Sequence, residues 1–236
     1  MFLDENQIAL PFNISDVKQV SDNNFNAKLK KYITAMLTRT IDILGGFVGC
    51  MCVIPITLAI IVNNIRNKDF GPIFFSQERI GKNGKIFRMY KFRTMVKDAD
   101  KKLEELLEKD EMARREYQKY KKLKNDPRVT KFGKVLRKTS LDEFPQFFNV
   151  LKGEMTLVGP RPYLPREKED MGEYYPYIVK QKPGVTGYWQ ITGRNDVTFE
   201  NRVDIDFRYH YKKSLTNDIK ILLITILVTV KRKGAM

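Results

Sequence analysis

The residues best suited to chemistry are two adjacent acids, Asp142 and Glu143, within the segment LRKTSLDEFPQFFNVLKG. Arg137 precedes Asp142 by five residues. A carboxylate beside a guanidinium group keeps a low pKa and stays ionised, and an ionised carboxylate can attack phosphorus as a nucleophile. A helix N-terminus and nearby arginines would bind the phosphates under attack. The pattern is compatible with phosphoryl transfer in which Asp142 is the nucleophile.

The same segment also has a purely structural interpretation. Ser140 and Glu143 have the spacing of a capping box, which marks the start of a helix, and Gly153 is suited to its end. The apolar face of that helix would contain Leu141, Phe144, Phe148 and Leu151. Asp142 and Glu143 would then be first-turn acids that complement the helix dipole. From the pattern alone, both interpretations stay open.

Two turn-forming segments follow. Residues 159–162 read Gly-Pro-Arg-Pro, a rigid turn that presents Arg161. Residues 182–196 contain glycines that permit tight turns, and Trp189 with Gln190 could serve a sugar or base pocket. Each segment is equally well explained as an ordinary turn. The single histidine, His210, lies between two tyrosines and is interpreted as structural.

The elements that position these residues are a hairpin and several helices. The runs 73–80 and 85–92 flank Gly-Lys-Asn-Gly, and Asn-Gly between β-rich runs predicts a β-hairpin. The second run ends in a basic cluster that includes Lys91 and Arg93. Residues 98–124 are rich in charge, with apolar residues near helical spacing, and predict a long solvated helix interrupted at Asp110.

A membrane segment is expected near the N-terminus. Residues 43–62 carry no charge, and a helix of that length extends about 30 Å, the thickness of a hydrocarbon core. Pro55 lies inside this run, where it removes a backbone hydrogen bond and bends a helix. Basic residues flank both ends, whereas a spanning helix usually has an excess at one end. A spanning helix, a re-entrant helix broken at Pro55 and a buried core helix all stay open.

Composition narrows the class of protein. The net charge of +15 implies an anionic partner, which can be a nucleic acid, a lipid surface or a phosphorylated substrate. The 236 residues suffice for one catalytic domain and an anchor. A second apolar stretch, residues 219–230, is too short to span a membrane and predicts a surface-lying amphipathic helix or a core helix. Cys50 and Cys52 indicate neither a disulfide framework nor a zinc site.

Four motifs, in this order, resemble the bacterial polyprenyl-phosphate phosphoglycosyl transferases of the small monotopic class. They are YKFRTM (90–95), LRKTSLDEFPQFFNVLKGEMTLVGPRP (136–162), KPGVTGYWQITGRND (182–196) and the ending VTVKRKGAM. The resemblance covers about residues 31–236, and the last part is most similar to undecaprenyl-phosphate galactose phosphotransferases. Those enzymes often carry further N-terminal membrane helices and another domain, so this chain is expected to be the catalytic unit alone.

The resemblance implies transfer of a sugar-1-phosphate from a UDP-sugar to undecaprenyl phosphate, with release of UMP. This is the first membrane step of O-antigen, capsule or exopolysaccharide synthesis. The expected sugar is galactose, with glucose or an N-acetylhexosamine as alternatives. Asp142 is implied as the nucleophile and the Mg²⁺ ligand, with Glu143 beside it, and Arg137 and Arg161 as phosphate-binding residues. Further motif positions assigned to substrate binding are Lys91, Arg93 and Arg194.

The resemblance also favours the re-entrant helix, although Ile54 stands where many relatives have serine. The expected fold is α+β and mostly helical, with a re-entrant membrane helix broken at a proline, a small β-hairpin and interfacial amphipathic helices. Its expected divisions are a loosely ordered leader (1–30), the membrane helix (31–68) and a cytoplasmic catalytic domain (69–236) at the bacterial inner membrane.

The expected partners are the UDP-sugar, undecaprenyl phosphate and anionic membrane lipids, and a homo-oligomer stays open. A function of another class, a membrane-anchored basic binding protein, is the alternative. The basic residues are scattered rather than gathered in one stripe with interleaved aromatic residues, which argues against nucleic acid.

Overall fold

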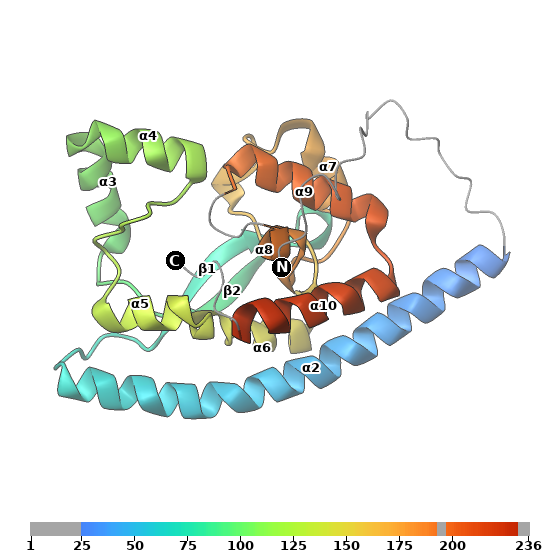
Figure 1. Cartoon of the computed structure of the whole chain (residues 1–236), viewed down its shortest axis with the longest axis horizontal. Helices are drawn as coiled ribbons and strands as arrows, with labels where there is room; N and C mark the ends of the chain where they lie inside the picture. Colours follow the sequence, from blue (N-terminus) through green and yellow to red (C-terminus); the bar gives the residue numbers. More distant parts are fainter. Residues whose placement is uncertain (1–24, 193–196, 231–236) are drawn as a thin grey trace.

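The computed structural model describes residues 25–192 and 197–230 and is mostly helical, which confirms the predicted α+β class (Figure 1). The α-helices are α2 (Phe25–Arg66), α3 (Ala99–Lys109), α4 (Glu111–Tyr120), α5 (Lys131–Lys138), α6 (Gln146–Lys152), α7 (Tyr175–Ile178), α8 (Tyr188–Thr192), α9 (Phe199–Lys212) and α10 (Leu215–Val230). The 3₁₀ turns are η2 (Lys82–Gly84), η3 (Leu141–Glu143), η4 (Pro165–Glu167) and η5 (Gly172–Tyr174). The strands are β1 (Phe74–Ile80), β2 (Ile86–Phe92), β3 (Thr156–Val158) and β4 (Gly184–Thr186).

The predicted hairpin is confirmed. Strands β1 and β2 are antiparallel, and Ile80 pairs with Ile86 next to the turn. At the turn, Asn83 has a φ of 57°, in the left-handed region that asparagine tolerates better than most residues. A second sheet, the parallel pair of β3 and β4, was not predicted, because three-residue strands are too short to show a periodic pattern.

The charge-rich segment forms two helices, with the interruption at the predicted residue. The Asp110 carboxylate accepts a hydrogen bond from the backbone amide of Ala113 at 3.0 Å and so caps the N-terminus of α4. Helices α3 and α4 stand to one side of the remaining elements (Figure 1). This position agrees with the prediction of a solvated segment.

Buried apolar side chains form separate clusters. One joins β2, β3, α8, α9 and α10, and a second joins α7 and α9 to the end of β1. The third is called the α2 cluster here, and its buried members are Val53, Ile60, Phe92 and Leu136. The α2 cluster therefore connects the long helix to the hairpin and to α5.

One face of α2 packs against the remainder of the protein. Its buried positions are 42, 46, 49, 53 and 60. Because these positions recur at helical spacing, they lie on one side of the helix. Gly49 allows the close approach to α6, since a Cβ at that position would overlap the ring of Phe147.

Two polar side chains fix the position of α2 along this interface. Arg39 donates from Nη1 to the carbonyl of Val150 at 2.7 Å and from Nη2 to that of Leu151 at 2.8 Å. These carbonyls lie at the C-terminal end of α6, where that of Val150 also accepts from the Gly153 amide at 3.0 Å. The buried Asp42 carboxylate accepts from the Thr156 hydroxyl at 2.9 Å and from the next backbone amide of β3 at 2.8 Å.

The expected break at Pro55 is not confirmed, because α2 is one continuous helix through this residue. Pro55 lies on the exposed side of α2, and the buried Val53 and Ile60 hold the helix against the domain on both sides of it. Helix α2 also curves gently around the domain (Figure 1), and such curvature accommodates the hydrogen bond that proline cannot donate. Packing of the opposite face thus outweighs the local effect of the proline.

The outer face of α2 is apolar and exposed, and within the described residues this helix, over Lys28–Arg66, is long and apolar enough to cross a membrane. Its exposed residues include Leu44, Phe47, Val48, Met51, Ile54, Leu58 and Val62. Helix α10 combines both predicted alternatives, because it buries Ile221 and Val228 in the domain. Its other side exposes Ile219, Leu223, Ile226 and Leu227. Residues 1–24, most of the predicted leader, lie outside the described residues, and α2 begins at Phe25.

We expect Gly49→Leu to destabilise the protein by about 1–3 kcal/mol, because the new side chain must displace the Phe147 ring. Denaturant unfolding of the detergent-solubilised protein measures this change. Val48→Leu, one residue away on the exposed face, is the matched control and should change the free energy of unfolding by less than about 0.5 kcal/mol. Equal stability of the two variants would contradict the close contact between α2 and α6.

Candidate active site

The adjacent acids lie in a short turn between two helices. Asp142 and Glu143 belong to η3, which links α5 to α6. Ser140 has a φ of 57°, in the left-handed region, whereas a capping residue has an extended backbone. Its side chain makes no capping hydrogen bond, and α6 begins only at Gln146. The predicted capping box is therefore wrong, and the acids belong to a turn of their own.

This turn is anchored on α2. Leu141 and Phe144, on either side of the two acids, pack against the α2 cluster. Asp142 is buried, with 8% of its surface exposed. The apolar neighbours thus hold the acidic turn against the cluster that α2 forms with the hairpin and α5.

The two carboxylates have different partners. Lys91, on β2, donates from Nζ to Glu143 Oε1 at 2.7 Å, and this ion pair is about three-quarters buried. In the part of the chain that the structure describes, Asp142 forms no ion pair. Glu143 is therefore held in place by a cation, whereas the Asp142 carboxylate is left for another ligand.

Burial raises the pKa of the Asp142 carboxyl above its ordinary value. The charge of Lys91 opposes this effect, Glu143 adds to it, and Arg137 opposes it. The low pKa predicted from the nearby arginine alone is therefore wrong, because removal of the carboxylate from water outweighs the attraction of the cations. A carboxylate with a raised pKa is also the more basic nucleophile once it is ionised.

Arg137 completes the group around Asp142. It lies in the last turn of α5, and its Nε donates to the Thr94 hydroxyl at 3.0 Å. Burial lowers the pKa of Arg137, and the Asp142 carboxylate is the strongest of the charges that oppose this change. The structure thus brings four of the predicted residues together: Lys91, Arg137, Asp142 and Glu143.

The other predicted residues lie elsewhere. Arg93 donates to Asp69 at 2.7 Å and to the Pro72 carbonyl at 2.6 Å, and so fixes the loop that follows α2. Arg161 lies beside Trp189, with its guanidinium 5.3 Å from the ring centroid. Arg194 lies outside the described residues. The substrate-binding roles of these three arginines stay predictions.

Asn149 positions the hairpin against the acidic turn. It is fully buried on α6, and its Oδ1 accepts from the backbone amide of Tyr90 at 3.1 Å. Its Nδ2 donates to the Arg88 carbonyl at 2.7 Å and to Glu154 at 2.7 Å. Because Tyr90 is adjacent to Lys91, this single amide sets the distance between the lysine and the acids that precede α6.

The sequence analysis missed two buried arginines near Arg161. Arg79, on β1, and Arg202, on α9, are 8% and 3% exposed. The sequence held one signal for Arg79: residues two apart on a strand lie on the same face, which places Arg79 beside Gln77. In the structure Arg79 donates to the Gln77 side chain at 2.6 Å. Arg202 lies on a helix with many charges, where no pattern marks one arginine as buried.

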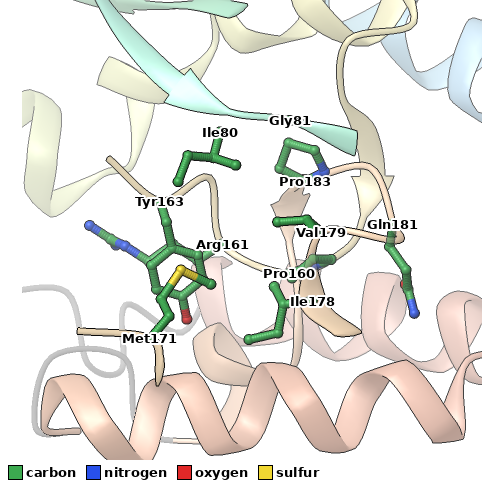
Figure 2. Close-up of a pocket in the computed structure, with 10 residues that line it drawn as sticks. All are labelled: Ile80, Gly81, Pro160, Arg161, Tyr163, Met171, Ile178, Val179, Gln181 and Pro183. Atoms are coloured by element: carbon green, nitrogen blue, oxygen red, sulfur yellow. The ribbon is translucent and has the colours of Figure 1, made fainter. Parts of the chain in front are cut away.

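A small cavity lies beside Arg161 (Figure 2). Its lining is mainly apolar and includes Ile80, Pro160, Met171 and Ile178, and the guanidinium of Arg161 points away from it. Such a lining gives no cation to a phosphate. The candidate active site is therefore the acidic turn and its cations, and not this cavity.

The family model described as bacterial sugar transferase matches residues 33–232. The chain belongs to the bacterial sugar transferase family. The candidate site, from Lys91 to Glu143, lies entirely within the matched residues. This membership agrees with the family predicted from the sequence motifs.

The names of individual relatives indicate which activities occur in this family. It is 45% identical over 207 residues, 88% of the chain and 43% of the relative, to an undecaprenyl-phosphate galactose phosphotransferase of Salmonella typhimurium. It is 44% identical over 219 residues, 93% of the chain and 44% of the relative, to a UDP-galactose-lipid carrier transferase of Erwinia amylovora. The chain spans less than half the length of these relatives. It is 40% identical over 203 residues to the exopolysaccharide production protein ExoY of Rhizobium meliloti, with 86% of the chain and 89% of the relative covered.

The site can be compared with what a magnesium ion requires. The described residues contain no group of three or more His, Cys, Asp or Glu side chains that could hold a metal ion. Magnesium is usually held by one or two carboxylates together with waters and substrate phosphates. The neighbouring Asp142 and Glu143 fit this mode, in which the substrate supplies the remaining ligands.

We expect Lys91→Met to raise the pKa of Asp142, because it removes the cation that lowers this pKa most, and Glu143→Gln to lower it, because it removes a like charge. Carboxyl ¹³C NMR of aspartate-labelled protein measures the shift, and Asp142→Asn identifies the resonance. Lys85→Met, an exposed lysine at the other end of the hairpin, is the control and should leave the pKa unchanged. Shifts of the same sign in the first two variants would contradict the described geometry.

Proposed function

We propose that this family member transfers a sugar-1-phosphate from a UDP-sugar to undecaprenyl phosphate and releases UMP. The observation that carries this proposal is the Asp142 carboxylate, which is buried, has no ion-pair partner in the described chain and lies beside Lys91 and Arg137. The turn that holds Asp142 packs on an apolar, outward-facing helix, which suits an acceptor that is a lipid. The activities named for the two galactose-transferring relatives agree with this reaction.

In the proposed first step, an oxygen of Asp142 attacks the donor phosphorus that bears the sugar. A bond forms between Asp142 and phosphorus, the phosphoanhydride bond breaks, and UMP leaves with the electron pair. In the second step, a phosphate oxygen of undecaprenyl phosphate attacks the same phosphorus. The bond to Asp142 then breaks, and the carboxylate is restored with the lipid-linked diphosphate sugar as product.

The surrounding residues have distinct proposed roles. Lys91 and Arg137 keep Asp142 ionised against the effect of burial and attract the anionic phosphates. Glu143, which Lys91 holds, is oriented beside the nucleophile rather than in its place. Asp142 and Glu143 would hold Mg²⁺ together with the donor phosphates, and the ion would neutralise charge on the phosphates.

Galactose is the proposed sugar, and its support is the similarity to relatives whose names specify galactose. Glucose and galactose differ in the orientation of one hydroxyl group. A site that hydrogen-bonds this hydroxyl discriminates strongly between them, whereas one that merely tolerates it does not. Glucose or an N-acetylhexosamine is therefore the alternative donor within the same reaction.

We also propose that α2 enters one leaflet and that both of its ends lie on the cytoplasmic face of the bacterial inner membrane. The support is that Arg39, Asp42, Gly49, Val53 and Ile60 all contact the same domain. Residues 39–60 of a helix extend roughly 30 Å, so a spanning orientation would draw the domain itself into the bilayer. In the proposed arrangement the outer apolar face of α2 contacts lipid, without the sharp break at the proline.

The reaction is tested with a labelled UDP-sugar in the absence of the lipid acceptor. We expect a hexose-phosphate adduct on the peptide that carries Asp142, detected by mass spectrometry, because the first step needs no acceptor. Asp142→Asn should form no adduct and should lose at least about a thousandfold in turnover, since it removes the nucleophile. Near-normal turnover of Asp142→Asn would overturn the covalent mechanism.

The same enzyme with undecaprenyl phosphate and a panel of UDP-sugars tests the donor. UMP release is expected to be fastest with UDP-galactose, to stop with EDTA and to return with Mg²⁺. A preference for UDP-glucose or a UDP-hexosamine would exclude galactose as the sugar but would still support the proposed type of reaction. No UMP release from any donor would favour the membrane-anchored binding protein instead.

Topology is tested with two variants, Lys30→Cys and Lys68→Cys, each with a single cysteine because Cys50 and Cys52 are replaced by alanine. The two positions are exposed and lie on either side of the apolar run. We expect a membrane-impermeant maleimide to label both positions only from the cytoplasmic side. Phe47→Cys, on the exposed apolar face, should react only after detergent is added. Labelling of Lys30 and Lys68 from opposite sides would show that α2 spans the membrane.

A further inference from the structure

Two buried arginines, Arg79 and Arg202, lie near the partly buried Arg161, which contacts the only tryptophan of the chain, Trp189. The arginine cluster is defined as Arg79, Arg161 and Arg202. The guanidinium groups of Arg161 and Arg202 lie 5.3 and 5.8 Å from the centroid of the Trp189 ring. The charge of Arg161 lowers the pKa of Arg79 and of Arg202, so Arg161 is the common neighbour of the other two cations.

The arginine cluster has more hydrogen-bond donors than acceptors. Arg79 donates to the carbonyl of Pro162 at 2.8 Å and to Gln77, and Arg202 donates to the carbonyl of Val197 at 3.3 Å. The buried Nε atoms of all three arginines have no hydrogen-bond partner within the described chain, nor has Nε1 of Trp189. Buried donors are normally paired, so these atoms indicate a missing acceptor.

The acids near the arginine cluster, Asp206 and Glu167, act on the pKa of Arg202 without pairing with it. No ion pair joins its members to an acid in residues 25–192 and 197–230. The buried Asp206 accepts with its Oδ2 from the Arg161 amide at 2.9 Å and from the Tyr163 hydroxyl at 2.8 Å, and its Oδ1 has no hydrogen-bond partner in the described chain. Burial, followed by repulsion from Arg161, lowers the pKa of Arg79 and of Arg202 to about 10. Buried cations without partners are costly, and an anion would remove that cost.

The place of the arginine cluster favours a water-soluble anion. Arg202 lies on α9, which is separated by α10 from α2 and hence from the apolar outer face of the protein (Figure 1). Arg79 is near enough to the candidate active site for the Glu143 carboxylate to raise its pKa. A ligand that reaches from the acidic turn to the arginine cluster therefore extends away from the membrane.

We propose that Arg79, Arg161 and Arg202 bind a phosphate group of the nucleotide part of the donor, so that the arginine cluster holds the UMP that leaves. This inference rests on the proposed function, which supplies a nucleoside diphosphate sugar as donor. Guanidinium groups match phosphate oxygens with paired, charge-assisted hydrogen bonds, and the Nε donors without partners supply the required positions. Arg79 and Arg202 are thereby substrate-binding residues that the sequence motifs did not identify.

Trp189 makes this site directly measurable, because it is the single tryptophan and two of the arginines contact its ring. We expect UMP to change the tryptophan emission of the detergent-solubilised protein in a saturable way, and uridine, which lacks the phosphate, to have no effect. A response to a short-chain polyprenyl phosphate but not to UMP would overturn the proposal. The measurement needs no turnover.

Arg79→Gln and Arg202→Gln should each weaken UMP binding by about tenfold or more, since each removes a charged hydrogen-bond partner. Arg208→Gln is the matched control on α9, because Arg208 pairs with Asp204 at 2.8 Å outside the arginine cluster, and it should bind UMP as the wild type does. Arg202→Lys keeps the charge without the planar fork and should lie between Arg202→Gln and the wild type.

Thermal unfolding separates a binding role from a structural one. A ligand site predicts that Arg202→Gln has an unchanged or higher Tm without ligand, since a buried unpaired cation is removed, and that it loses the rise in Tm that UMP gives the wild type. A lower Tm together with undiminished UMP binding would overturn the proposal.

Failure of this inference can be distinguished from failure of the proposed function. If the arginine variants bind UMP and transfer the sugar as the wild type does, the inference is refuted and the proposed function still holds. If UMP binding depends on Arg202 but the wild-type enzyme transfers no sugar, the nucleotide site is supported and the proposed reaction is refuted.

Discussion

The buried amide of Asn149 is the interaction on which the candidate site most depends. It pairs with the backbone of β2 on both sides of Met89 and so joins the hairpin to α6. Lys91 lies on that strand, and the acids precede that helix, so the ion pair between Lys91 and Glu143 follows from this one contact. Removal of the amide would leave a buried amide and a buried carbonyl without partners, which costs about 1–3 kcal/mol for each group.

The same helix connects the site to the long apolar helix. The carbonyls at the end of α6 are satisfied by Arg39, and its Phe147 side chain lies where Gly49 leaves room. Helix α6 therefore has the hairpin on one side and α2 on the other. The proposed chemistry on phosphates and the proposed contact with lipid would thus depend on neighbouring faces of one short element.

Much of this organisation could be predicted from sequence, where the signal is local. The Asn-Gly turn specified the hairpin, and Asp110 specified the end of one helix and the start of the next, because both effects depend on a few adjacent residues. The continuity of α2 through Pro55 and the raised pKa of Asp142 could not be predicted, since both depend on packing between distant segments. For the same reason Arg202 gave no signal, because only the folded chain places it against Trp189.

The anchoring of Leu141 and Phe144 on α2 also determines how deep the reacting carboxylate lies. In the proposed arrangement, the acidic turn packs on the α2 cluster while the opposite face of α2 contacts lipid, so the height of Asp142 above the lipid would be set by the thickness of one helix, about 10 Å. A phosphate at the membrane surface is then presented at a constant level, whatever the length of the hydrocarbon chain below it. In the proposed reaction, the acceptor would be recognised by the position of its head group, and its tail would stay in the bilayer.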